Sequence, residues 1–133
     1  MSGSTPYPLA IILCDQIIVD ETSKRKTLVG IFDVIYAKQF PAVHYPLSVY
    51  VRLTDAEGKY AFRMDYVQVK TDKRLAHAEI PEVPIADRLK VHELIMQFPP
   101  IKIPEPGEYE FRLWANDRYM GRMKFTAVKS EGK

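Results

Sequence analysis

The hydrophobic and polar positions of this chain follow the two-residue rhythm of β-strands. Runs rich in Val, Ile, Tyr, Phe and Leu alternate with breaks of Pro, Gly, Asp or Asn, which is typical of an all-β chain. Helix formers between 86 and 98 would allow a helix there, but Pro84 and the Pro99-Pro100 pair favour a strand. The runs predicted as strands are 9–19, 27–36, 46–54, 60–70, 75–80, 89–98, 108–115 and 119–128.

The alternation also assigns faces to the predicted strands. In run 46–54 every second residue is apolar, which predicts a buried face made of Leu47, Val49, Val51 and Leu53. Run 60–70 starts with the same rhythm, and its phase shifts after Tyr66. We therefore expect either a bulge near Tyr66 or a strand buried on both faces there.

Two short loops are expected to set the register of neighbouring strands. Gly58 lies between two runs, and this predicts a hairpin whose loop spans 56–59 and whose strands bring Leu53 opposite Phe62. Between the last two runs, a two-residue turn would place the charged Arg122 beside Phe111 in the core. A three-residue loop, 116–118, pairs Phe111 with Met123 instead, and we expect this longer loop.

The first two runs differ from the others because successive residues in them are apolar. This pattern predicts strands buried on both faces, or strands at the centre of a sheet that loops cover. The charged segment 20–26 between them is expected to be a solvated hairpin loop. The proline-rich stretches 81–84 and 99–106 are expected to be exposed connections that cross between two sheets.

Together these elements predict an all-β fold, an antiparallel Greek-key β-sandwich of about eight strands, with a closed β-barrel as the alternative. A chain of 133 residues has room for one ordinary domain. We expect that domain to span 9–128, between a flexible N-terminal segment, 1–8, and a flexible C-terminal tail, 129–133.

Two parts of the sequence resemble known proteins. The stretch 106–113, Pro-Gly-Glu-Tyr-Glu-Phe-Arg-Leu, resembles an edge of immunoglobulin-like sandwiches in which a tyrosine bonds to the backbone and closes a corner. This resemblance implies an immunoglobulin-like architecture and a structural role for Tyr109. The cysteine pair of antibody domains is absent, so the kinship it implies is architectural.

The second resemblance covers most of the chain. Segment 10–20, Ala-Ile-Ile-Leu-Cys-Asp-Gln-Ile-Ile-Val-Asp, a lysine-rich turn and segment 27–33 resemble the opening hairpin of a family of small bacterial proteins of unknown function. The strand at 106–111 extends the resemblance toward the C-terminus. It implies a bacterial, cytoplasmic, single-domain β-sandwich and supplies no catalytic residues.

Charge and cysteine content exclude several classes of function. Nineteen Lys and Arg against 17 Asp and Glu give a net charge of +2, which lacks the strongly basic footprint of a nucleic-acid binder. Cys14 is the only cysteine, so the chain forms no internal disulfide, as is usual in a reducing cytoplasm. No signal peptide begins the sequence and no run is long enough to span a membrane. We therefore expect a cytoplasmic protein that binds neither membrane nor nucleic acid.

Few residues suggest chemistry. The three histidines fall on different predicted elements without metal-ligand spacing, so we expect no metal, no cofactor and no catalytic residue. Cys14 lies in an apolar strand, where a buried thiol is inert. Asp15 and Asp33 interrupt the two most hydrophobic runs. They could form an acid–base pair, but aspartates bonded to backbone or to nearby cations are the favoured interpretation.

The remaining candidates lie on the surface. An exposed tryptophan beside arginine is typical of an interaction hot spot, and the alternation points a set of such residues away from the core: Tyr50, Arg52, Arg112, Trp114 and Arg122. The alternative for Trp114 is cover by the proline-rich crossovers or a place in a second core layer. The sequence thus favours a non-enzymatic protein-interaction or structural module that binds a protein partner or itself. The second hypothesis is a small-ligand carrier or hydrolase with a cavity between the sheets lined by Cys14, Asp15 and Asp33.

Overall fold

In this computed structural model, which describes residues 5–131, each predicted run contains at least one strand, and the segment open to a helix is strand. Two predicted runs are each divided in two, and two short strands, β5 and β10, lie where none is predicted. The strands are β1 (Tyr7–Cys14), β2 (Gln16–Val19), β3 (Lys26–Val29), β4 (Val34–Ala37), β5 (Ala42–His44), β6 (Leu47–Thr54), β7 (Gly58–Gln68), β8 (Lys73–Ile85), β9 (His92–Phe98), β10 (Ile101–Ile103), β11 (Gly107–Ala115) and β12 (Arg118–Lys129).

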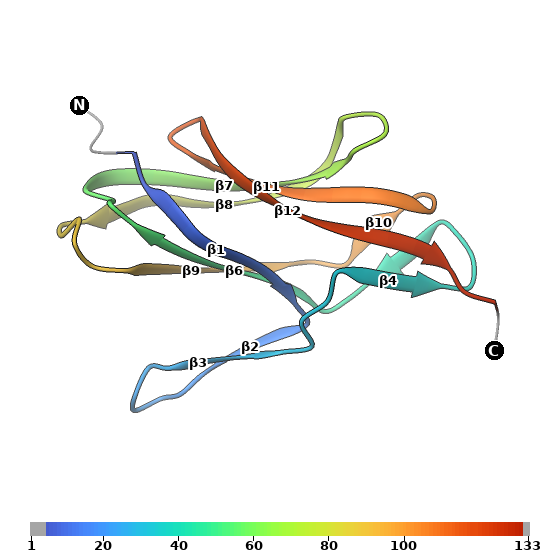
Figure 1. The fold of residues 1–133 in the computed structure, drawn as a ribbon, viewed down its shortest axis with the longest axis horizontal. Coiled ribbons are helices and arrows are strands. Elements are labelled where there is room, and N and C mark those ends of the chain that lie inside the picture. The colour runs from blue at the N-terminus through green and yellow to red at the C-terminus, as the bar shows by residue number, and fades with distance from the viewer. Residues whose placement is uncertain (1–4, 132–133) are drawn as a thin grey trace.

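Most of the strands form two facing sheets (Figure 1), while β5 pairs with β10 and β2 pairs with β3 in separate two-stranded sheets. The first sheet has the order β1-β6-β9 and the second has the order β4-β12-β11-β7-β8. These orders match the A-B-E and G-F-C arrangement of immunoglobulin domains, so the predicted Greek-key sandwich is confirmed over the barrel. Pairing is antiparallel throughout both sheets except that β4 runs parallel to β12, which makes the second sheet mixed.

Aromatic side chains fill the space between the sheets. Tyr66, Tyr109, Phe111 and Phe125 of the second sheet stack on one another, with ring centroids 5.1 to 6.2 Å apart. Phe98 of the first sheet meets Phe111 edge-on at 5.1 Å. These rings are almost fully buried, as are the predicted core residues of β6. Burial of these rings stabilises the packing of the two sheets against each other.

The predicted hairpin with its loop at 56–59 is wrong, because β6 and β7 belong to different sheets. The segment crosses from one sheet to the other, with Ala56 buried and Asp55 at a φ of 60°. The hydroxyl of Tyr60 donates to the carbonyl of Glu57 and accepts from its amide, at 3.0 and 2.9 Å. Leu53 and Phe62 both enter the core, but from opposite sheets. A glycine between two alternating runs marks a turn without showing which sheet the chain enters next.

In the last hairpin, between β11 and β12, the predicted strand pairing is confirmed but the predicted loop is wrong. Phe111 pairs with Met123 as predicted. The turn, however, is the two-residue Asn116-Asp117, since Ala115 already pairs with Arg118, and both turn residues have positive φ. A register shift opposite Leu113 and Trp114 adds one residue to β12 and keeps each face consistent. The bulge, and not a three-residue loop, therefore brings Phe111 opposite Met123.

The prediction that the first two runs are buried on both faces is also wrong. The first run breaks at Asp15: β1 is an edge strand of the first sheet, and β2 leaves that sheet to pair with β3 alone. The β2–β3 hairpin exposes much of its apolar surface, including Ile18 at 52%. The segment 20–25 forms its tip, which agrees with the predicted solvated loop, although Lys26 already belongs to β3.

The proline-rich stretches behave differently from each other. Residues 99–106 cross between the sheets as predicted, but the prediction that they are exposed is wrong for β10, where Ile101 and Ile103 are buried. Residues 81–84 do not cross, because they continue the edge strand β8, a position that tolerates proline. Near Tyr66, β7 is buried on both faces and its pairing with β8 shifts, so both expected alternatives hold.

The strands begin at Tyr7 and end at Lys129, slightly beyond the predicted domain limits on both sides. Residues 1–4 and 132–133, which belong to the two ends predicted to be flexible, lie outside the described part of the chain. Within residues 5–131 no helix of a length and apolarity suited to crossing a bilayer is found.

Candidate functional site

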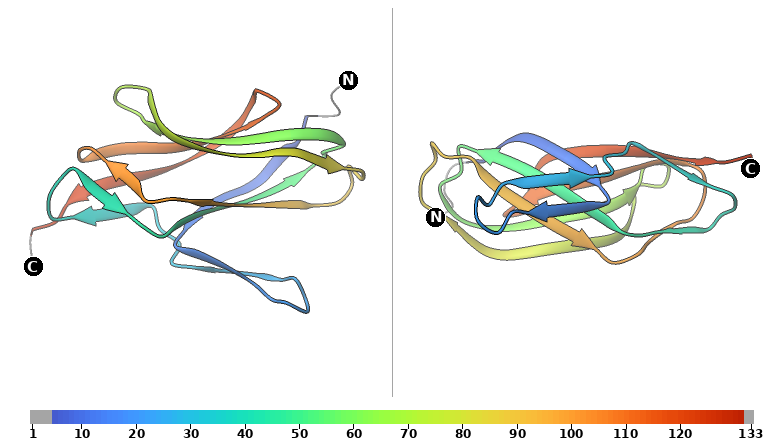
Figure 2. Two further views of the ribbon diagram at one scale, coloured as in Figure 1. Left: turned by 180° about the vertical axis from the view of Figure 1, so that it is seen from behind. Right: turned by 90° about the horizontal axis from the view of Figure 1, so that it is seen from below.

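The outer face of the first sheet carries two grooves. The β2–β3 hairpin turns away from the end of β1 and stands over this face (Figure 2). Ser48 and Tyr50 of β6 point outward because they alternate with the core residues Leu47 and Val49. The hairpin leaves one open groove at its base and a second near its tip.

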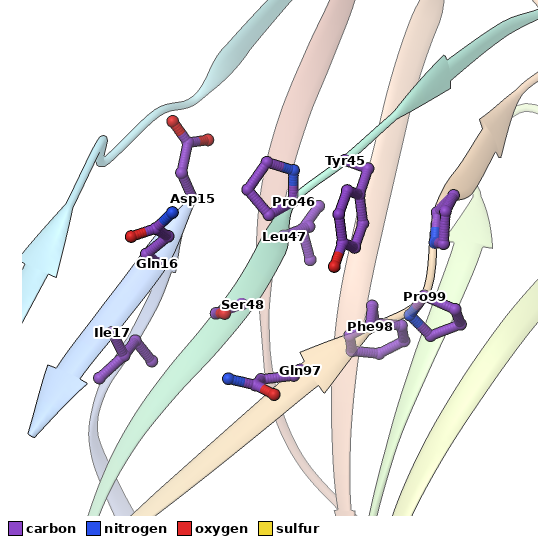
Figure 3. Close-up of a pocket in the computed structure, with 11 residues that line it drawn as sticks. Asp15, Gln16, Ile17, Tyr45, Pro46, Leu47, Ser48, Gln97, Phe98 and Pro99 are labelled. Carbon is purple, nitrogen blue, oxygen red and sulfur yellow. The ribbon is translucent and has the colours of Figure 1, made fainter.

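The groove at the base of the hairpin has a volume of about 830 Å³, and we call it the tyrosine groove (Figure 3). β2 forms one side, the start of β6 lies in the middle, and the end of β9 with the following prolines forms the other side. Its lining residues are Asp15, Gln16, Ile17, Tyr45, Pro46, Leu47, Ser48, Gln97, Phe98, Pro99 and Pro100. Its size suits a small ligand or a short stretch of chain.

Apolar contact surface in the tyrosine groove comes from rigid side chains. Tyr45 is 65% exposed, and Pro46, Pro99 and Pro100 line the groove with it. Leu47 and Phe98 also line the groove, although both are almost completely buried by the core. Proline and tyrosine lose little side-chain freedom on binding, so such a surface favours association.

Polar groups are distributed around this apolar surface. Gln16 of β2 and Gln97 of β9 contribute amides from opposite sides of the groove, and Ser48 of β6 contributes a hydroxyl between them. Each amide offers both donors and an acceptor. Asp15 is the one charged side chain among the lining residues, so the groove has a weakly acidic character.

Asp15 is held in place by the chain around it. Its amide donates to the carbonyls of Val29 and Gly30, at 2.9 and 3.1 Å, which closes the base of the hairpin. Gly30 has a φ of 72°, and a Cβ added there would lie 2.4 Å from a carboxylate oxygen of Asp15. His44 Nε2 lies 3.9 Å from the other carboxylate oxygen. Burial lowers the pKa of His44, and the charge of Asp15 only partly opposes this.

The second opening, near the hairpin tip, is organised by one carboxylate. Glu93 of β9 accepts from Lys26 of β3 and from Tyr50 of β6, and it lies 3.2 Å from Arg52 Nη1. Burial opposes ionisation of Glu93, but the hydrogen bonds from Lys26 and Tyr50 and the nearby positive charges outweigh it and lower its pKa. Tyr50 is only 6% exposed, so the expectation that it offers an exposed ring is wrong.

The predicted surface residues do not form one patch. Tyr50 and Arg52 lie on the outer face of the first sheet, whereas Arg112, Trp114 and Arg122 belong to strands of the second sheet. Arg112 bonds to Glu110 at 2.8 Å and to an aspartate of the β7–β8 loop at 2.9 Å. Arg122 lies 3.5 Å from the same glutamate. These arginines are therefore engaged in ion pairs along the second sheet.

Trp114 is half-buried rather than displayed. The guanidinium of Arg63 lies 5.0 Å from its ring centroid, and Tyr119 packs edge-on at 5.5 Å. Its indole nitrogen is buried and has no hydrogen-bond partner among the described residues. Arg63 and Tyr119 both lie in strands, and they contribute to its cover. We therefore place the candidate site in the tyrosine groove and not at Trp114.

The three polar residues proposed to line an internal cavity are not gathered there. Cys14 is fully buried, with its thiol against the carbonyls of Gln16 and Ser48, and burial raises its pKa. Asp33 is exposed in the link between β3 and β4. Asp15 lines the external tyrosine groove. These three side chains therefore do not line one internal cavity together.

The residues that matter most here were not singled out by sequence. Tyr45, Gln97 and Pro99 lie at strand ends whose alternation indicates only that they are not core. Their proximity depends on β2 leaving the sheet at Asp15, which no local pattern predicts. Within residues 5–131, no group of three or more His, Cys, Asp or Glu is placed to hold a metal ion.

Comparison with known proteins gives a family and a similar structure. The model of a family of unknown function, DUF6941, matches residues 9–128. None of the curated proteins matches the chain. Among solved structures it is similar to an immunoglobulin-like protein from Pseudomonas aeruginosa, at 11% identity and a TM-score of 0.41, covering 92% of this chain and 96% of that one. No activity follows from these similarities.

Proposed function

Because this chain belongs to a family of unknown function, DUF6941, we propose its role from its own surface: it is a non-enzymatic module that binds an extended segment of a partner protein in the tyrosine groove. The observation that carries the proposal is an exposed tyrosine, Tyr45, set among Pro46, Pro99 and Pro100 in an open groove with amides on both sides. Grooves lined by aromatic rings bind extended, proline-rich segments. We place the module in the cytoplasm, in keeping with its single, buried cysteine, Cys14.

The chemistry of the groove indicates what the bound segment contains. Gln16 and Gln97 can bond to the N–H and C=O groups of an extended backbone, which supports a peptide. A polyproline II segment arrives already extended, so little conformational entropy is lost on binding. Asp15 is the charged side chain of the lining and favours a ligand with a positive charge. The occupant that fits is a proline-rich segment carrying an arginine or lysine.

A defined peptide tests the proposal. An isotopically labelled sample is titrated with a proline-rich decapeptide that ends in arginine, and the amide resonances are followed by NMR. We expect the changes to concentrate at Gln16, Ser48 and Gln97. Tyr45→Ala should weaken binding by about tenfold, because loss of one aromatic contact is worth about 1 to 2 kcal/mol.

Tyr36→Ala provides a matched control. Tyr36 is exposed to the same degree as Tyr45, 68% against 65%, but does not line the groove, so its removal should leave binding unchanged. The proposal is wrong if the peptide causes no changes at millimolar concentration, or if both variants weaken binding equally. Self-association is the competing role, and size-exclusion chromatography across a concentration series would reveal it as a shift to earlier elution.

A further inference from the structure

The groove near the hairpin tip is strongly cationic. Lys24, Arg25 and Lys26 from the hairpin and Arg52 from β6 line it together with one carboxylate, Glu93, which gives the lining a net charge of +3. The whole chain carries only +2, so positive charge is concentrated here. The groove has a volume of about 580 Å³, and Leu28 and Tyr50 complete its lining. We call it the cationic groove.

The hairpin tip is ordered by one aspartate that does not itself line the groove. The side chain of Asp20 accepts from the amides of Thr22 and Ser23, at 3.1 and 2.6 Å. Its backbone amide donates to the carbonyl of Arg25 at 2.8 Å, and its carbonyl accepts from the amide of Lys24 at 2.9 Å. The carboxylate of Asp20 is therefore bonded to backbone amides, and hydrogen bonds from Ser23 lower its pKa.

The opposite wall is also held in place. Glu93 joins Lys26 to the buried hydroxyl of Tyr50, and Arg52 Nη1 lies 3.0 Å from that hydroxyl. One nitrogen of the Arg52 guanidinium makes both of its contacts, while its side chain is 44% exposed. A guanidinium has five N–H donors, so donors remain for a ligand. Glu93, the single carboxylate of the groove lining, thus holds Lys26 and Arg52 in position.

From this geometry we propose that the cationic groove binds a phosphate-bearing small molecule, with Lys24, Arg25 and Arg52 as its contacts. Several cations around a concave site focus positive potential and favour a multiply charged anion. Arginine and lysine together are the residues that bind phosphate oxygens. The size of the groove suits a small molecule. This inference does not depend on the tyrosine groove, because the two lining sets share no residue.

Inorganic pyrophosphate is the probe that tests this site. Titration calorimetry at pH 7 and low salt should show one binding event, weakened at high salt because screening reduces the attraction. The double variant Lys24→Gln and Arg25→Gln should weaken binding by at least about tenfold, since two charge-assisted contacts to the phosphate oxygens are lost. Both residues are exposed at the tip, so the variant is expected to fold normally.

A second double variant tests whether binding depends on the cations of the groove or only on the net charge of the protein. Lys70→Gln with Lys73→Gln removes the same two charges from exposed positions around the β7–β8 loop. This variant should bind pyrophosphate as the unchanged protein does. The proposal is overturned if pyrophosphate does not bind, if both double variants lose equal affinity, or if only long polyanions such as heparin bind. The proline-rich peptide should bind the Lys24 and Arg25 variant normally, so failure here is distinct from failure at the tyrosine groove.

Discussion

Lys26 of β3 and Glu93 of β9 form an ion pair between segments 67 positions apart in the sequence. This pair links the β2–β3 hairpin, which otherwise pairs only with itself, to an edge strand of the first sheet. An isolated two-stranded hairpin is marginally stable in water, so the link helps to hold the hairpin over the sheet. Both grooves have one wall on that hairpin and depend on its position.

Replacement of Glu93 by glutamine should loosen the hairpin. The charge that attracts Lys26 and Arg52 is lost, and we expect a decrease in the free energy of unfolding of about 1 kcal/mol. Hydrogen exchange should show faster exchange at the β3 amides that bond to β2. Glu108→Gln is the control, because Glu108 pairs with Lys124 on the second sheet and lies far from the hairpin in the fold. Equal protection of the hairpin in both variants would contradict this prediction.

The stabilisation of the β2–β3 hairpin by Glu93 should depend on pH. The pKa of Glu93 is lowered in the folded state, so its stabilising contribution is complete above the usual glutamate value of about 4.3. The contribution is lost as the pH falls through the lowered pKa, when the carboxylate is protonated. Hairpin protection should therefore be constant from pH 7 to about 5 and decrease below about 4. In Glu93→Gln this decrease should be smaller.

Tyr109 closes a corner through its hydroxyl, as the resemblance to immunoglobulin-like sandwiches implied. The hydroxyl donates to the carbonyl of Glu105 at 2.6 Å and accepts from its amide at 3.2 Å. Tyr109→Phe keeps the buried ring and should lower the free energy of unfolding by about 1 to 2 kcal/mol. Tyr36→Phe should have no effect, because Tyr36 is exposed. Chemical denaturation with unchanged m-values would measure both, and a loss below about 0.3 kcal/mol for Tyr109→Phe would contradict the corner role.

The Asn116-Asp117 turn should be sensitive at its first position. Asn116 has a φ of 49°, its side chain accepts from the amide of Ala61 at 2.8 Å, and it donates to the carbonyl of Lys59 at 3.1 Å. Asn116→Ala loses both hydrogen bonds and strains the backbone, so we expect a destabilisation of about 2 kcal/mol. Asp117→Gly should be neutral or stabilising, since glycine suits the positive φ of 64° there. Thermal denaturation of the two variants tests the contrast.

Gly30 should tolerate no side chain. Its positive φ and its distance to Asp15 mean that alanine would strain the backbone and displace the carboxylate. Gly30→Ala should therefore lower stability by about 1 to 3 kcal/mol and weaken binding of the arginine peptide. Gly107→Ala separates the two effects, because its φ is also positive but no atom lies within 4 Å of the added Cβ. That variant should lose stability without losing peptide affinity.

The two-sheet fold could be predicted from the sequence because the alternation of apolar and polar residues is a local property of each strand. Alternation in β6 and β11 identifies the core residues Val51 and Phe111 without knowledge of their partners. Tyr109 was also identified correctly, from its short motif. Where the pattern failed, the outcome depended on distant contacts: the crossing from β6 to β7, and the bulge that replaced the longer loop before β12.

The tyrosine groove could not be predicted from the sequence. An apolar run such as 9–19 shows the same residues whether it is buried or divided at Asp15 into an edge strand and a free hairpin. Trp114 was expected to be an interaction residue, but Arg63 and Tyr119 cover it. Tyr45 carries no periodic signal, and its exposure follows from the position of the segment before β6.

The central claim is that the tyrosine groove binds a peptide and selects its charge through Asp15. Gln97→Lys tests it directly, because Gln97 is exposed, lines the groove and does not contribute to the core. The added cation offsets the negative charge of Asp15, so the preference for a decapeptide ending in arginine over the same peptide ending in glutamate should be lost. Equal binding of the two peptides by the unchanged protein, or an unchanged preference in Gln97→Lys, would contradict the claim.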